Sequence, residues 1–172
     1  GLFVHITKNT RSDQPIHVIY QSTGNSSSLQ NQSRLLVVLE AGAEATVIEH
    51  FVSAKNDQSN TVSNNVCELI IGDNARLNHY RLSIEEQGMV HFGAVHAHLS
   101  AHSNLDSFVL NLGSWFKRTD FTIQHTESGS HSELAGMYLP HNDEHVDLRT
   151  FVEHRVPNCT SNEVIRGILD DK

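Results

Sequence analysis

The sequence has very little proline and cysteine, and it has no long apolar run. It contains three prolines and two cysteines, Cys67 and Cys159. Two cysteines cannot make the disulfide framework of a small secreted domain, so we expect a reducing, cytoplasmic compartment. The longest apolar run, Leu35–Leu39, is far too short to cross a membrane, and no segment resembles a signal peptide. We therefore expect no membrane association.

Basic residues are also few. Twelve lysines and arginines stand against twenty acidic residues, which gives a formal net charge of −8 with histidine neutral. An acidic field repels nucleic acid and anionic lipid, and no basic run opposes it, so we expect neither partner. The thirteen histidines are numerous for 172 residues. Because most histidines gain charge as pH falls through about 6.5, we expect solubility and any weak metal affinity to depend on pH.

The sequence does contain many short runs of β-branched and apolar residues, bounded by Gly, Asn, Ser and Asp. Long patterns with a period of 3.6 residues are missing, so we predict an all-β chain. Polar segments 23–33 and 53–60 are predicted loops. The predicted strands are 2–6, 16–21, 35–39, 45–52, 66–71, 76–84, 90–99, 107–112, 116–125, 133–139 and 146–154.

One pattern recurs along the chain at a nearly constant spacing. If Gly42 is position zero, its counterparts are Gly72, Ser100 and Gly129, at steps of 30, 28 and 29 residues. In each copy a small residue follows three positions later, and aliphatic residues follow five and ten positions later. A strand repeat of about 29 residues predicts a right-handed parallel β-helix, or β-solenoid, that forms a single domain over residues 1–172.

This repeat also predicts which residues stack on one another. Gly42 and Gly72 should lie at stacked corners, where successive coils run about 4.8 Å apart. The apolar side chains five and ten positions after each corner residue should form core ladders. The repeat also includes the residues eight positions after the corner, which are His50, Tyr80, Phe108 and Met137. Since five and eight differ by three, inward side chains at both positions require a bend or bulge between Val47 and His50. The core ladders are predicted to include the pairs Val47/Leu77 and Val52/Leu82.

Two histidines are candidate metal ligands. His96 and His98 lie two apart on a predicted strand, so they share a face and could bind one ion, even if only adventitiously. The pair is faintly similar to a cupin metal motif, but no glutamate follows at a suitable spacing. We favour a solvated polar face, because the repeat points both side chains outward, next to Glu68, His125, Ile70 and Glu127.

The two cysteines differ in their surroundings. Cys67 falls in an inward ladder, where we expect a small core residue. Cys159 lies in a polar turn, and residues 160–163 (Thr-Ser-Asn-Glu) match a capping box. That box would place Cys159 at a helix N-terminus and lower its thiol pKa. The competing interpretation is that residues 164–169 form the next strand. Cys159 is the only candidate for cofactor binding.

Acidic residues gather in one further segment, where Asp143, Glu144 and Asp147 bracket two histidines. Paired carboxylates on a β-helix could serve glycosidic chemistry, although a solvated loop is the simpler interpretation. The chain has no Gly-rich phosphate loop, no Gly-x-Ser-x-Gly and no Cys-x-x-Cys. We therefore predict no catalytic residues and no enzyme.

Four segments carry recognisable motifs: residues 34–51, residues 113–121, His-Arg-Val-Pro-Asn-Cys-Thr-Ser at 154–161, and Arg-Gly-Ile-Leu at 166–169. Together they resemble the SufB/SufD core domain, a family that builds iron–sulfur clusters. The Pro-x-Cys-x-Ser form of the 154–161 segment is more similar to SufD than to SufB. The resemblance implies a right-handed parallel β-helix, in agreement with the repeat.

The resemblance also implies partners. A SufD-like subunit acts as a non-enzymatic scaffold with a SufB-like subunit and two copies of SufC, an ABC-type ATPase, around a nascent iron–sulfur cluster. Family members have N- and C-terminal helical regions, which we expect to lie outside these 172 residues with the residues of cluster chemistry. We expect no tightly bound cofactor here. Unpaired coil ends should favour a homodimer.

Two other functions remain as alternatives. A carbohydrate-active or carbohydrate-binding β-helix would need paired carboxylates and exposed aromatic residues, and Trp115 is the only tryptophan. A cupin-like metal-binding protein would use His96 and His98.

Overall fold

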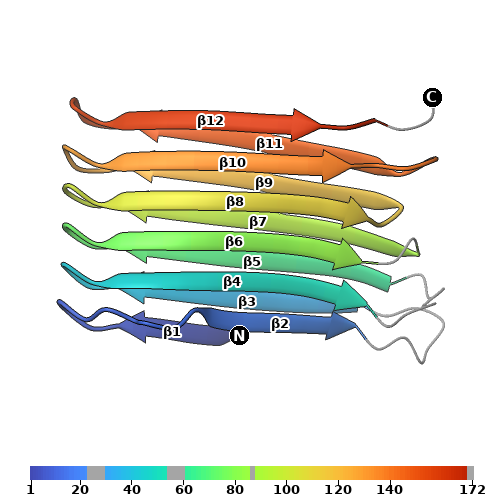
Figure 1. The fold of residues 1–172 in the computed structure, drawn as a ribbon, viewed down its shortest axis with the longest axis horizontal. Helices are drawn as coiled ribbons and strands as arrows, with labels where there is room; N and C mark the ends of the chain where they lie inside the picture. The colour runs from blue at the N-terminus through green and yellow to red at the C-terminus, as the bar shows by residue number, and fades with distance from the viewer. Residues whose placement is uncertain (23–29, 54–60, 86–87, 170–172) are drawn as a thin grey trace.

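The computed structural model describes residues 1–22, 30–53, 61–85 and 88–169 (Figure 1). Its regular structure is entirely β-strand. None of the described residues forms a helix long and apolar enough to cross a membrane. The strands are β1 (Leu2–Ile6), β2 (Ile16–Ser22), β3 (Gln30–Leu39), β4 (Glu44–Ser53), β5 (Thr61–Ile71), β6 (Arg76–Glu85), β7 (Met89–Leu99), β8 (Asn104–Gly113), β9 (Phe116–His125), β10 (His131–Leu139), β11 (His145–His154) and β12 (Thr160–Gly167).

The strands form two parallel six-stranded sheets. One sheet has the order β1-β3-β5-β7-β9-β11, and the other has the order β12-β10-β8-β6-β4-β2. In Figure 1 the even strands run to the right in front and the odd strands return behind them while the chain climbs. The coil is therefore right-handed, and the predicted parallel β-helix is confirmed. Strand β3 begins at Gln30, so the predicted loop 23–33 was too long; residues 23–29 and 54–60 lie outside the described residues.

Inward-facing apolar side chains from both sheets form the core, toward the ends of the odd-numbered strands and the starts of the even-numbered strands. Alternate residues of each central strand are buried, as the period of two for a strand requires. Burying each such Leu or Val contributes about 1.5–3 kcal/mol. The core ladder of the odd sheet consists of Leu35, Val37 and Leu39, then Cys67, Leu69 and Ile71, then Val95, Ala97 and Leu99, then Phe121 and Ile123.

Each coil turns at a residue with a left-handed backbone. The turn residues, with φ between 54° and 80°, are Asn9, Gly42, Asn74, His102, Gly129 and Asn158. Successive turns are linked directly, for example by the N–H of Gly42 to the carbonyl of Asp73 and by the N–H of Asn74 to the carbonyl of Ala101. The predicted corners at Gly42 and Gly129 are confirmed.

The predicted corners at Gly72 and Ser100 were wrong by two residues. The N–H of Gly72 donates to the carbonyl of Leu39, so Gly72 stacks beside Glu40 and the turn itself comes at Asn74. Asparagine and histidine can adopt the left-handed conformation, so a search for small residues alone misses them. The true steps from Gly42 to Gly129 are therefore 32, 28 and 27 residues, which average 29.

The predicted bulge is also absent. Strand β4 continues unbroken to Ser53, with Glu49 and Phe51 pointing inward after Val47. Val52 and Leu82 consequently lie on the outward face and not in a core ladder. Val47 and Leu77 are both buried, as expected, but Val47 pairs with His79 and Leu77 pairs with Ala45.

The left-handed turns make a simple prediction. Replacing Asn74 by valine should destabilise the fold by about 1–2 kcal/mol, because a β-branched residue is strained at its φ of 56°. Replacing it by glycine should cost much less, since glycine adopts this conformation freely. Urea unfolding of both variants checks this, and equal losses would contradict the role given to the turn.

Candidate functional site: a buried polar network

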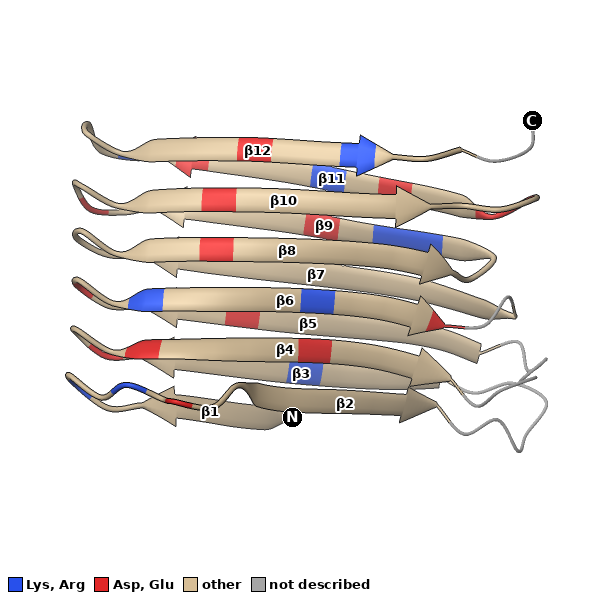
Figure 2. Ribbon diagram, in the orientation of Figure 1, with Lys and Arg blue, Asp and Glu red and all other residues tan. Residues whose placement is uncertain are grey.

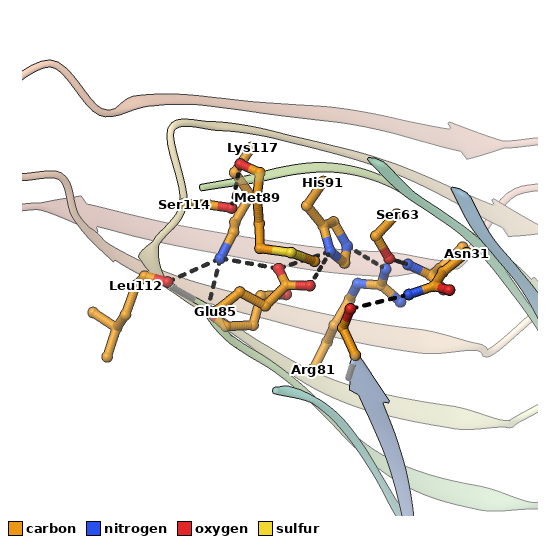
Figure 3. A network of polar contacts seen from close by, with 12 residues as sticks. Asn31, Ser63, Arg81, Glu85, Met89, His91, Leu112, Ser114 and Lys117 are labelled. Carbon is orange, nitrogen blue, oxygen red and sulfur yellow. Dashed lines mark hydrogen bonds and ion pairs between the residues drawn. The ribbon is translucent and has the colours of Figure 1, made fainter. Parts of the chain in front are cut away.

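A network of charged side chains occupies the interior beyond the apolar core (Figure 3). Glu49 from β4, Arg81 and Glu85 from β6, His91 from β7 and Lys117 from β9 are all almost completely buried. The strand alternation that buries Val47 and Leu77 also directs these groups inward. Burying charges is expensive unless they are paired, so their contacts decide whether the coil is stable.

Glu49 lies at one end of the network. Its Oε1 accepts a hydrogen bond of 2.8 Å from Nη1 of Arg81 and lies 3.1 Å from Nε2 of His79. Nδ1 of His79 is in turn 2.9 Å from Oγ of Ser107. Burial acts to raise the pKa of Glu49, but Arg81 and His79 outweigh it and lower that pKa to about 2. This carboxyl is therefore charged inside the coil.

Glu85 and Lys117 lie at the other end. Glu85 Oε2 is 2.9 Å from Nδ1 of His91 and 3.6 Å from Nζ of Lys117, which donates to the carbonyls of Ser83 and Leu112 at 2.9 Å each. Burial acts to raise the pKa of Glu85, but its partners lower it. Burial also lowers the pKa of Lys117 to about 8.

Arg81 and His91 connect the two ends. Nη2 of Arg81 is 3.2 Å from Nε2 of His91, and since a guanidinium can only donate, Nε2 accepts and Nδ1–H donates to Glu85. His91 is thus held as the neutral tautomer, in agreement with the lowering of its pKa by burial. The Arg81 guanidinium also lies 4.4 Å from the centre of the Phe51 ring. Two carboxylates balance one guanidinium and one ammonium.

The network adjoins a cavity of about 470 Å³ between the two sheets. Its lining within the described residues is mainly amides and hydroxyls from β2, β3 and β5, with Tyr20, Phe51, Glu85 and Met89. The arrangement could accommodate water or a small polar molecule in the interior of the coil. Its charged groups, however, are engaged with one another, and none is paired as a nucleophile with a free base.

Cys67 lies in the core, as predicted. It is fully buried, and burial raises the pKa of its thiol well above the usual value. Its sulfur lies within 4.8 Å of ligand atoms of Glu49 and His79. Arg81 already occupies the Glu49 carboxylate at 2.8 Å, which disfavours a cation at this position.

Cys159 lies in the turn before β12. The strand interpretation of the following segment is confirmed, and the predicted helix N-terminus at Cys159 was wrong, since β12 is a strand from Thr160. The half-buried thiol is 3.4 Å from the carbonyl of Glu127 and 3.5 Å from Oγ of Ser130. These neighbours are a carbonyl and a hydroxyl, and a role of Cys159 in cofactor binding stays a prediction.

His96 and His98 point outward from β7, as predicted. Their neighbours Glu68 and Ile70 on β5 were also predicted correctly. On β9 their neighbours are Thr122 and Gln124, and the prediction of His125 and Glu127 was wrong. The error arises mainly because the predicted repeat placed the corner before β8 two residues too early. Among the described residues no third metal-ligand side chain joins this pair.

The acidic segment before β11 is mostly engaged in local contacts. Glu144 Oε2 accepts the N–H of His141 at 3.0 Å, and Asp147 pairs with Arg149 at 3.1 Å. Exposed Trp115 does border Asp143 and Glu144 around a hollow of about 260 Å³. The Glu144 carboxylate is used to close its own turn.

These features describe a right-handed parallel β-helix with a polar network inside it, and the comparisons place it in a family. Residues 19–172 match the family model described as "SUF system FeS cluster assembly, SufBD core domain". The chain belongs to the SufBD family.

Several relatives agree with this. The chain is 27% identical over 171 residues to the iron–sulfur cluster assembly protein SufD of Escherichia coli, covering 98% of this chain and 40% of that protein. It is 25% identical over 166 residues to a SufBD family protein of Mycobacterium tuberculosis, and this match covers 96% of this chain and 40% of that protein. A SufBD family protein of Mycobacterium leprae is 30% identical over 132 residues, and this match covers 77% of this chain and 32% of that protein. The chain thus spans about 40% or less of the length of these relatives.

Proposed function

We propose that this chain is the β-helical part of a cytoplasmic, non-enzymatic scaffold subunit in SUF iron–sulfur cluster assembly. The observation that carries the proposal is the family match over residues 19–172. The interior supports it as well. The charged groups of the network bond to one another between neighbouring coils, as Arg81 does with Glu49. We infer that such pairs favour one stacking register between neighbouring coils.

The partners in this proposal are a SufB-like subunit and a SufC-like ATPase, with a nascent iron–sulfur cluster as cargo of the whole complex. The described part of the chain provides no thiol pair that could hold a cluster, since Cys67 is buried in the core and Cys159 lies in a turn. Cluster ligands would come from the rest of the complex.

Affinity purification of the full-length tagged protein, co-expressed with a SufB-like and a SufC-like protein under anaerobic conditions, tests this proposal. We expect a stable complex that contains all three, and no iron-dependent absorbance for the scaffold subunit alone. A subunit that purifies without either partner would contradict the proposal. Hydrolysis of glycosides by the subunit alone would favour the carbohydrate alternative.

A further inference from the structure

The outward face of the even-numbered sheet carries a second cluster of polar side chains. Unlike the buried network, this cluster is accessible to solvent and consists of possible metal ligands. Asp106 on β8 and His131 and Glu133 on β10 each contribute one ligand atom, and these atoms lie within 4.8 Å of one another. Glu133 pairs with Asp106 across the two strands, and His131 is two residues before Glu133 on the same face. The spacing is set by rigid parallel strands and not by a loop.

Within the described part of the chain, no Lys or Arg forms an ion pair with the carboxylates of this cluster. Figure 2 shows the acidic segments of β8 and β10 side by side, on strands that carry no Lys or Arg. Neither carboxylate forms an ion pair with a described residue, whereas Glu68 and Asp147 on the other sheet have arginine partners. Like charges on neighbouring strands destabilise a sheet, so a bound cation would stabilise this one.

The next strand supports the cluster from the other side. Oγ1 of Thr160 on β12 lies 2.7 Å from Nδ1 of His131, and Nδ2 of Asn162 donates to Oε1 of Glu133 at 3.2 Å. Contacts of this kind orient ligand side chains in known metal sites. They hold the imidazole and one carboxylate in place before any ion binds.

We propose that Asp106, His131 and Glu133 form a binding site for a divalent transition-metal ion such as Zn²⁺, Fe²⁺ or Mn²⁺. One imidazole and two carboxylates, without a thiolate, are ligands that these ions accept. The site adjoins a groove of about 330 Å³ whose apolar lining includes Tyr80, Phe108 and Val164. The groove leaves the outer side of the ion open to water or a small ligand. This inference does not depend on the proposed function.

Calorimetric titration of the metal-free full-length protein with Zn²⁺ tests the proposal. The variants Asp106→Asn, His131→Gln and Glu133→Gln should each weaken binding by about 100-fold or more, and Thr160→Val should weaken it by about tenfold. The control is the double variant His96→Gln/His98→Gln, which removes the half-buried, outward-facing histidine pair of β7 and should leave this affinity unchanged. Circular dichroism establishes that each variant is folded.

A spectroscopic measurement tests the same site without relying on the calorimetric signal. Co²⁺ bound by the unaltered protein should give visible absorption bands that disappear in His131→Gln and remain in the His96→Gln/His98→Gln control. Zn²⁺ should also raise the melting temperature of the unaltered protein and not that of Asp106→Asn. The proposal is overturned if Zn²⁺ fails to bind, or if it binds the three ligand variants as tightly as the unaltered protein.

Discussion

Replacement of Arg81 by methionine should destabilise the protein by about 3–5 kcal/mol. Arg81 is completely buried, and its guanidinium donates to Glu49 at 2.8 Å and contacts His91 at 3.2 Å. Methionine fills much of the same space but cannot pair with the carboxylate. Glu49 would then be buried with His79 as its remaining close partner. Urea unfolding, analysed by linear extrapolation, measures the loss.

A matched surface pair provides the control. Arg34 also bonds to a glutamate on the neighbouring coil, Glu68, but its side chain is 65% exposed. Arg34→Met should therefore cost less than about 1 kcal/mol. The double variant Glu49→Leu/Arg81→Met removes both buried charges and should recover most of the stability lost in Arg81→Met. Similar losses for Arg34→Met and Arg81→Met would contradict the account of the network.

Much of the fold could be predicted from the sequence because a solenoid repeats. Every predicted strand overlaps an observed one, and the buried positions of β5 and β7, such as Leu69 and Ala97, follow from simple alternation. The register was harder. Gly72 resembles Gly42 in the sequence, but the structural counterpart of Gly42 is Asn74. Small residues and left-handed residues occur at different positions of the same turn, so a repeat aligned on small residues alone shifts by two.

The buried network was missed for a related reason. Searching for apolar ladders led to a predicted bulge after Val47, which would have brought Val52 inward and turned Glu49 outward. Unbroken alternation from Val47 places Glu49 inside, and from Leu77 it places Arg81 inside. The signal was present in the strand period. It is overlooked because isolated buried charges are unfavourable, and the partners that compensate them lie on other coils, about thirty residues away.

Acidification should destabilise the protein progressively, and the direction follows from the buried groups. The pKa of Glu49 falls from its ordinary value of 4.5 to about 2 in the folded state, and that of Glu85 is also lowered. Between these values the unfolded chain binds a proton that the folded chain does not, so stability present above pH 4.5 is lost as pH falls toward 2. Burial likewise lowers the pKa of His91 below 6.5, so its contribution begins to fall below that pH.

Glu49 alone should account for a loss of roughly 2 kcal/mol between pH 7 and pH 3, at about 1.4 kcal/mol per pH unit. Urea midpoints measured across this range provide the test. The double variant Glu49→Leu/Arg81→Met lacks this carboxyl. Its loss of unfolding free energy between pH 7 and pH 3 should therefore be smaller than that of the unaltered protein by about this 2 kcal/mol. If the two proteins lose stability in parallel, Glu49 is not held ionised in the folded state. The network would then stabilise the coil by hydrogen bonding and packing, without the charge separation that the contacts of Arg81 indicate.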